Sequence, residues 1–176
     1  MISIRKQRPA DVAPREALLD QAFGKLRWRK SSQRLRDGRT PADGLAFVAA
    51  DGKRVVGTAR LWETLCETGE PALLLGPVAV AADCRNRGIG SALVRRAIAA
   101  ARRPGHRAII LVGDAQYYGR FGFSTDKTAG LRMPGPFERD RLLALELVPG
   151  ALENARGLLK AAVPSGPRTR VTASAA

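Results

Sequence analysis

Arg85, Gly88 and Gly90 form the spacing Arg-x-x-Gly-x-Gly where an apolar run gives way to a helical pattern. A helix N-terminus leaves backbone N–H groups unpaired and carries roughly half a positive charge. Glycines let a ligand approach those N–H groups closely, and an arginine adds a charged fork. The turn is therefore a candidate phosphate-binding site. A helix that simply begins with flexible glycines has the same spacing, so the interpretation depends on the elements around it.

Those elements narrow the choice of phosphate ligand. An apolar run at 73–80 predicts a buried strand, and apolar residues at helical spacing predict a helix from about Gly88 to Arg103. A further buried strand at 108–112 implies a parallel, right-handed crossover. A dinucleotide-binding fold would need Gly-x-Gly-x-x-Gly with an acidic residue after the next strand, and a nucleoside-triphosphate loop would need Gly-Lys-Ser/Thr. The chain has neither pattern.

The turn resembles the acetyl-CoA-binding motif of the GCN5-related N-acetyltransferases (the GNAT superfamily), which is Arg/Gln-x-x-Gly-x-Gly/Ala after a strand. A second stretch, Tyr118-Gly119-Arg120-Phe121-Gly122-Phe123, is similar to that family's Tyr-x-x-x-Gly-Phe. The longer form Gly-Asp-x-x-Tyr-Tyr-x-Arg-Phe-Gly-Phe resembles one branch of predicted acetyltransferases. The chain departs from the family at Leu111 and Asp114, where Asn and Ala are common.

The resemblance covers about residues 1–148 and implies a fold, which we take as the expectation. It is an α/β (α+β) fold, with a mixed central sheet of about six to seven strands. A V-shaped split separates strands four and five, and helices flank the sheet. Residues 149–176 are expected to form a C-terminal helix, around 151–162, followed by a flexible tail.

The resemblance also implies acetyl-CoA (coenzyme A) as the cofactor. Its pantetheine arm would pair with backbone groups of the bulged strand, and its phosphates would lie on the turn. The expected cofactor-binding residues are Val78, Ala79, Val80, Arg85, Asn86, Arg87, Gly88, Ile89, Gly90, Ser91 and Tyr118. Cys84, just before the turn, is either a reactive thiol or a small packed residue.

Direct transfer of an acetyl group to an amine needs a proton for the departing thiolate and a neutral amine. Tyr118 is the candidate general acid, because the resemblance selects it over Tyr117 and a phenol stays protonated at neutral pH. Packing of the two rings on Phe121 and Phe123 is the structural alternative. Glu63, on a predicted strand, is the candidate general base, although a carboxylate facing solvent fits the same pattern. Asp114 and Glu67 are reserves, and a dedicated base is not required.

In the resembled family the helices after the first strand form one wall of the acceptor site. Candidate acceptor contacts are therefore Arg27, Trp28, Arg29 and Arg34, together with Glu63. An exposed basic helix face is the alternative interpretation. The acceptor itself is expected to be a primary amine of a small molecule or a peptide, and its identity is open.

Composition limits the class of protein. With 45% hydrophobic and 26% charged residues in 176, the chain is expected to form one folded domain. It has no apolar run long enough to span a membrane and no signal-peptide pattern, so the expected location is the cytoplasm. Two cysteines and one histidine form no metal-binding pattern, so no metal is expected.

The formal net charge of +14 favours anionic partners, although an arginine-rich composition explains it equally simply. The charge leaves two further functions open. One is acetylation of aminoacyl-tRNA, as in toxin members of the resembled family, and the other is a non-catalytic module that binds acyl-CoA or RNA. Both a monomer and a homodimer are compatible with the sequence. The leading hypothesis is an acetyl-CoA-dependent N-acetyltransferase.

Overall fold

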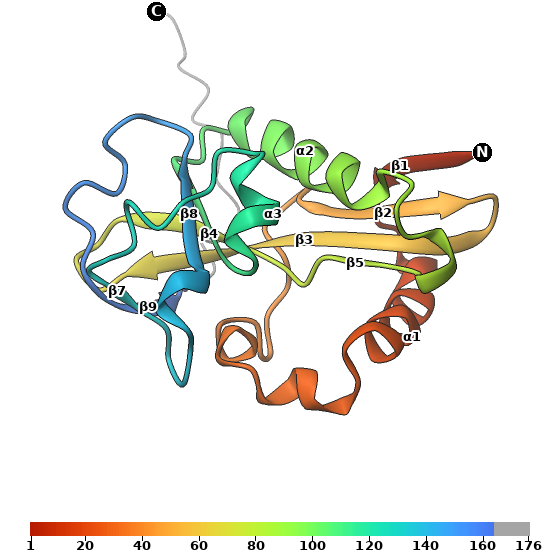
Figure 1. The fold of residues 1–176 in the computed structure, drawn as a ribbon, viewed down its shortest axis with the longest axis horizontal. Coiled ribbons are helices and arrows are strands. Elements are labelled where there is room, and N and C mark those ends of the chain that lie inside the picture. Colours follow the sequence, from red (N-terminus) through yellow and green to blue (C-terminus); the bar gives the residue numbers. More distant parts are fainter. Residues whose placement is uncertain (164–176) are drawn as a thin grey trace, which may run out of the picture.

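The computed structural model describes residues 1–163, which form a mixed sheet with helices on both faces (Figure 1). The strands are β1 (Ile2–Lys6), β2 (Ala46–Asp51), β3 (Arg54–Cys66), β4 (Pro71–Leu75), β5 (Ala79–Val80), β6 (Ala108–Val112), β7 (Leu131–Arg132), β8 (Leu142–Glu146) and β9 (Gly157–Ala161). The main path runs β1-β2-β3-β4-β6-β8, and β5, β7 and β9 lie off it. The expected α/β fold with a mixed central sheet is confirmed. No helix within the described range is long and apolar enough to cross a membrane.

The longest strand, β3, connects the two halves of the sheet. Its first half pairs with β2 and β5, and its second half pairs with β4 and β9, all antiparallel. The register of β2 and β3 shifts between Ala49 and Ala50, next to Gly57, which marks a β-bulge. A Cβ at Gly57 would come within 2.9 Å of Leu93 Cδ1, so the missing side chain lets helix α2 pack directly on the strand.

Two longer helices cover the sheet. Helix α2 (Ile89–Arg102) lies on one face and α1 (Val12–Phe23) on the opposite face (Figure 1). The buried stripe of α2 includes Ile89, Leu93 and Ala97, which confirms the helix predicted from apolar spacing. The remaining helical elements are short: η1 (Pro9–Asp11), η2 (Lys25–Arg29), η3 (Ser31–Leu35), η4 (Ala82–Cys84), α3 (Ala115–Gly119) and η5 (Arg139–Arg141).

The sheet opens where β4 ends. Parallel pairing between β4 and β6 joins Leu73 to Ile109 and Leu74 to Ile110. Beyond Leu75 the chain passes through a cis Gly76–Pro77 peptide into β5, which pairs with β3 alone. The two parallel segments therefore diverge, as the expected V-shaped split requires.

The C-terminal part differs from the expectation. Residues predicted as a helix form turns followed by β9, whose residues Leu159–Ala161 pair with Cys66–Thr64 of β3. Gly157 has φ +84, and Glu67 accepts a hydrogen bond of 2.7 Å from the Leu158 N–H. The segment up to Ala161 is thus an integral part of the sheet, so the expected boundary after residue 148 does not separate it. The predicted tail from residue 164 lies outside the described residues.

Candidate active site

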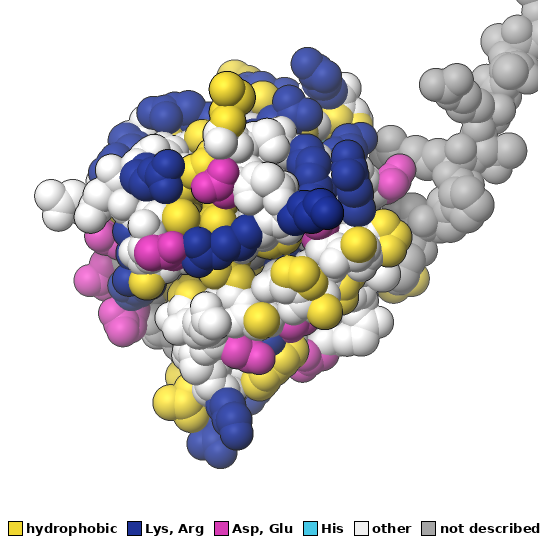
Figure 2. All heavy atoms as spheres, turned by 90° about the vertical axis from the view of Figure 1, so that its right-hand side faces the viewer, with side chains coloured by type: hydrophobic (Ala, Val, Ile, Leu, Met, Phe, Trp, Pro, Cys, Tyr) yellow, Lys and Arg dark blue, Asp and Glu magenta, His cyan; other side chains and the backbone are white. Residues whose placement is uncertain are grey.

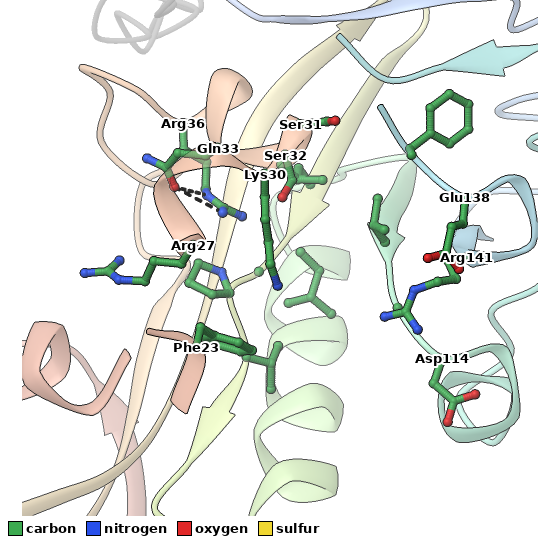
Figure 3. A pocket seen from close by; sticks show the side chains of 18 of the residues that line it. Phe23, Arg27, Lys30, Ser31, Ser32, Gln33, Arg36, Asp114, Glu138 and Arg141 are labelled. Carbon is green, nitrogen blue, oxygen red and sulfur yellow. Dashed lines mark hydrogen bonds between the residues drawn. The ribbon is translucent and has the colours of Figure 1, made fainter. Parts of the chain in front are cut away.

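A cavity of about 670 Å³ opens at the split between β4 and β6. The end of β4 and Gly76–Val78 form one side, and Gly113 and Asp114 before α3 form another together with Tyr118 within it. The opposite wall comes from the short helices that follow α1, with further residues from 136–141 (Figure 3). The cavity therefore joins segments that are far apart in the sequence.

The carbonyl oxygen of Gly76, at the apex of the split, accepts a hydrogen bond of 2.6 Å from the buried Trp62 indole N–H. The Gly76 N–H donates to the Arg60 carbonyl at 2.8 Å. Both polar groups of the glycine backbone are thus held by β3. This fixes the position where the chain leaves β4.

Tyr118 lines the cavity from helix α3. Its ring lies at an edge to Tyr117, with ring centroids 4.9 Å apart, and to Phe123 at 6.0 Å. Burial, and then the neighbouring Tyr117, raises the pKa of Tyr118 to about 12, so the phenol keeps its proton at neutral pH. Gly113 leaves room for the ring, because a Cβ there would lie 2.6 Å from Tyr118 Cε2. Tyr118 therefore packs against the neighbouring aromatic rings and also lines the cavity.

The predicted phosphate-binding turn begins helix α2. Gly88 is the N-cap with φ +75, and no side chain caps the helix. Asn86 also has positive φ, at 61°. The N–H groups of Gly88, Ile89 and Gly90 thus lie at a helix start without a side-chain acceptor, which suits an anion. A Cβ at Gly90 would be 3.0 Å from the Tyr117 hydroxyl, so the turn and α3 approach closely.

The surface around this turn is basic. In the side view of Figure 2, Lys and Arg side chains are numerous on the upper part of the face. Arg85 and Arg87, within the turn, are exposed, and so is Arg54, which forms an ion pair of 2.7 Å with Asp83 just before the turn. Arg85 and Arg87 form no ion pair within residues 1–163.

The other predicted residues of the turn have defined places. The side chain of Ile89 is buried in the core, so only its backbone faces a ligand. Ser91 Oγ lies 3.5 Å from the Tyr117 hydroxyl. Cys84 is also buried in the core, 3.8 Å from Arg87 Nη1, which fits a packed residue.

Strand β5 offers a free backbone edge to the split. Ala81 N–H donates to Val56, and Ala79 is the residue paired with Thr58. Hydrogen-bonding direction alternates along an antiparallel strand, so the N–H and C=O of Val80 point away from β3. Val78, two residues earlier, lines the cavity. The backbone of Val78 and Val80, rather than that of Ala79, is thus available to a ligand in the split.

The predicted acceptor wall is present but uses different residues. Arg27 lines the cavity, yet its guanidinium is bound by Glu16 at 2.6 Å and Asp20 at 2.9 Å. Trp28 lines a separate cavity of about 210 Å³, and Arg29 lines none of the three described cavities. Arg34 donates to the carbonyl of Pro134. Sequence reasoning missed Lys30, Arg36 and Arg141, all of which line the main cavity.

Glu63 is not part of the main cavity. It is half-buried on β3 and lines a cavity of about 480 Å³ with Lys6, Gln7 and residues 39–46. The structure does not bring it together with Tyr118, so we do not retain it as a general base or an acceptor contact. The reserve Glu67 binds the backbone of Leu158, whereas the reserve Asp114 lines the main cavity. No cluster of metal-ligating side chains occurs in the described part of the chain.

Comparison with known proteins agrees with this geometry. Residues 42–125 match the family model of the acetyltransferase (GNAT) domain. No curated protein matches the sequence.

Solved structures match over most of the chain. The GNAT family N-acetyltransferase YhbS from Escherichia coli, in complex with CoA, is 25% identical with a TM-score of 0.75, over 92% of this chain and 89% of that chain. A GNAT family acetyltransferase from Brucella melitensis, in complex with acetyl-CoA, is 28% identical with a TM-score of 0.64, over 85% and 90%. Together with the family model over residues 42–125, these matches show that the chain is similar to GNAT acetyltransferases in its central sequence and in its fold.

Proposed function

We propose that this protein transfers the acetyl group of acetyl-CoA to a primary amine. One observation carries the proposal: Val78 and Tyr118 line the cavity at the split, and a Cβ at Gly90, in the uncapped start of α2, would lie 3.6 Å from Val80 Cγ2 and 3.0 Å from the Tyr117 hydroxyl. The E. coli and Brucella structures, which contain CoA and acetyl-CoA, support the same cofactor here.

Residues at the split would hold the cofactor in two ways. The N–H groups of Gly88 and Gly90 would bind its phosphates, with Arg85 adding charge. The backbone of Val78 and Val80 would pair with the extended arm as an additional strand does. Bound acetyl-CoA supplies an activated thioester, so the protein's task is to orient and polarise.

Tyr118 would supply the proton that the departing thiolate needs. The raised pKa of about 12 keeps the hydroxyl protonated across the physiological range. On the acceptor side, Asp114 replaces Glu63 as the residue that takes the amine proton through water, because it lines the same cavity as Tyr118.

Calorimetric titration with acetyl-CoA tests the cofactor site. We expect micromolar binding by the wild type and none by Gly88→Glu, which places a negative side chain in the phosphate-binding turn. No heavy atom lies within 4 Å of a Cβ at Gly88, so the variant loses binding through charge and not through a clash. Gly69→Glu is the matched control, because Gly69 also has positive φ and open space but lies between β3 and β4.

Two outcomes of this titration would contradict the proposal or its interpretation. Equal loss of binding in both variants would assign the effect to backbone strain. A folded wild type that binds no acetyl-CoA would overturn the proposed activity.

A further inference from the structure

Three cationic side chains from separate segments line the acceptor side of the main cavity. Lys30 follows the 3-10 helix η2, Arg36 follows η3, and Arg141 ends η5. In Figure 3 the Lys30 ammonium group and the guanidinium groups of Arg36 and Arg141 turn into the cavity, whereas that of Arg27 turns away. The cavity thus concentrates positive charge that the sequence disperses over more than a hundred residues.

None of these three cations forms an ion pair within 4.0 Å among residues 1–163. The carboxylates that line the cavity are Asp114 and Glu138. Asp114 Oδ1 accepts a hydrogen bond from the Gln116 N–H at the start of α3, and Glu138 is exposed at the rim. Three cations therefore face two carboxylates, one of which already caps a helix.

Arg36 is the buried member of the group. The residue is 8% exposed, and its Nε and Nη2 atoms donate to Gln33 Oε1 at 3.3 and 3.2 Å. The direct acceptor is a neutral amide and the Asp37 carboxylate acts on Arg36 only through space, so burial still lowers the pKa of Arg36 to about 10. Its Nη1 atom would be 3.5 Å from a Cβ at Gly76, where the split begins. Arg36 thus places one free edge of its guanidinium beside the expected reaction centre.

Lys30 is exposed to the positive charges of the other two cations. Burial lowers the pKa of Lys30, and the charges of Arg36 and Arg141 lower it further. Its ammonium nitrogen lies 4.7 Å from the Phe23 ring centroid, a contact that positions the charge without neutralising it. Mutual repulsion of this kind is relieved when an anion binds between the groups.

We propose that the amine acceptor carries an anionic group, a carboxylate or a phosphate, and that Arg36, Lys30 and Arg141 bind it. This inference rests on the proposed acetyltransferase function and adds the substrate class. The bound anion would hold the acceptor in the cavity that Tyr118 lines, so the amine is presented to that end of the cavity. Arg36 and Arg141 suit either anion, because a guanidinium binds both carboxylate and phosphate oxygens.

Binding of probe anions tests the site without an acceptor. The protein is first saturated with CoA, which occupies the phosphate-binding turn, and is then titrated with inorganic phosphate or malonate at constant ionic strength. We expect a saturable rise in thermal unfolding temperature. It should be lost in Arg36→Gln and weakened in Lys30→Gln and Arg141→Gln, whose exposed sites tolerate the change.

Lys25→Gln is the matched control, because it removes an equal charge from the segment of Lys30 at an exposed site that lines none of the described cavities. No saturable effect of either anion, or an equal effect in the three cavity variants and the wild type, would overturn the proposal. Failure of the anionic-acceptor proposal can be distinguished from failure of the proposed enzyme function. Absence of CoA binding contradicts acetyl transfer, whereas CoA binding without anion binding contradicts only the anionic acceptor.

Matched amines then distinguish carboxylate from phosphate. Release of CoA thiol is measured with β-alanine and its amide, and with O-phosphoethanolamine and ethanolamine. We expect kcat/KM for one anionic amine to exceed that for its neutral counterpart about tenfold or more, as a charged hydrogen bond allows. This ratio of kcat/KM values should fall toward one in Lys30→Gln and Arg141→Gln, because KM for the anionic amine rises. A preference for the neutral amines would contradict the proposal.

Discussion

The indole N–H of Trp62 is 2.6 Å from the carbonyl oxygen of Gly76, and this bond fixes the residue at which the sheet begins to split. Trp62 lies on β3, whose neighbours hold it rigidly, while Gly76 is the first residue after β4. The geometry of the cavity therefore depends on this side-chain contact, together with the backbone bond from the Gly76 N–H to the Arg60 carbonyl.

Trp62→Phe should destabilise the protein by about 1–3 kcal/mol, because it leaves the Gly76 carbonyl without its donor. Trp28→Phe is the matched control for stability, since Trp28 is 52% exposed and should change it by less than about 0.5 kcal/mol. Denaturant unfolding measures both. Equal effects of the two substitutions would show that the Gly76 bond contributes little.

Tyr118→Phe should lower kcat about a hundredfold while leaving the affinity for acetyl-CoA unchanged, because only the proton donor is removed. The ring contacts with Tyr117 and Phe123 remain. Tyr117→Phe is the comparison. Its hydroxyl lies 3.5 Å from Ser91 at the start of α2, so its effect should fall on KM for acetyl-CoA. A large fall in kcat for Tyr117→Phe alone would reverse the assignment.

The protonation state of Tyr118 determines how kcat should change at high pH. A general acid works in its protonated form, so activity that depends on Tyr118 is present below its pKa and is lost above it. With the pKa raised to about 12, kcat should show no alkaline decline centred near pH 10, where an ordinary tyrosine titrates. A pH–rate profile from about pH 8 to 11 measures this. A decline with a midpoint near 10 that disappears in Tyr118→Phe would contradict the raised pKa.

Asp11 should govern stability in acid. Its carboxylate accepts hydrogen bonds from Arg5 at 2.6 and 2.9 Å and from the Arg8 N–H at 2.7 Å, and Arg5 is the main cause that lowers its pKa to about 2. This stabilisation is present above the unfolded value of about 4 and is lost as the pH falls towards 2.

Asp11→Asn should therefore reduce stability at pH 7 and flatten the loss of stability between about pH 4 and 2. Unfolding free energies across that range test it. Asp126→Asn, at an exposed site without an ion pair within residues 1–163, is the control and should leave the slope unchanged. The same slope in Asp11→Asn and the wild type would contradict the role of Asp11.

The sequence predicted those elements whose pattern is contained within a short stretch of neighbouring residues. The apolar stripe of α2 and the glycines before it are both recognised within a few residues. The strand at 108–112 is equally clear from its uninterrupted apolar run. The split in the sheet and the position of Tyr118 were expected from the family resemblance that these local motifs carry, and not from local signals alone.

The prediction of a C-terminal helix was wrong because pairing with a strand distant in sequence outweighs the local helix propensity. Residues 151–162 are rich in Ala and Leu, which favour a helix in isolation. In the fold, the end of β3 has a free edge, and Leu159 and its neighbours complete it. Gly157 turns the chain next to Glu67, an interaction across 90 positions of sequence that no local pattern contains.

The acceptor side was only partly predictable. Alternation along β3 places Glu63 on the same face as Leu61, and no sequence pattern shows which cavity that face borders. The cluster of Lys30, Arg36 and Arg141 could not be predicted from the sequence for a similar reason. Lys30 and Arg36 are two among 30 basic residues, and only the fold brings Arg141 to them.

The two sides of the cavity are built from different kinds of structure. The proposed cofactor side consists of β5 and the start of α2, which are part of the sheet and its packed helix, whereas the proposed acceptor side consists largely of short 3-10 helices and loops. Substitutions at Lys30 or Arg141 change the charge of the acceptor wall without altering a strand. Acceptor preference can therefore diverge among homologues, or be redirected by directed evolution, while cofactor chemistry is inherited unchanged.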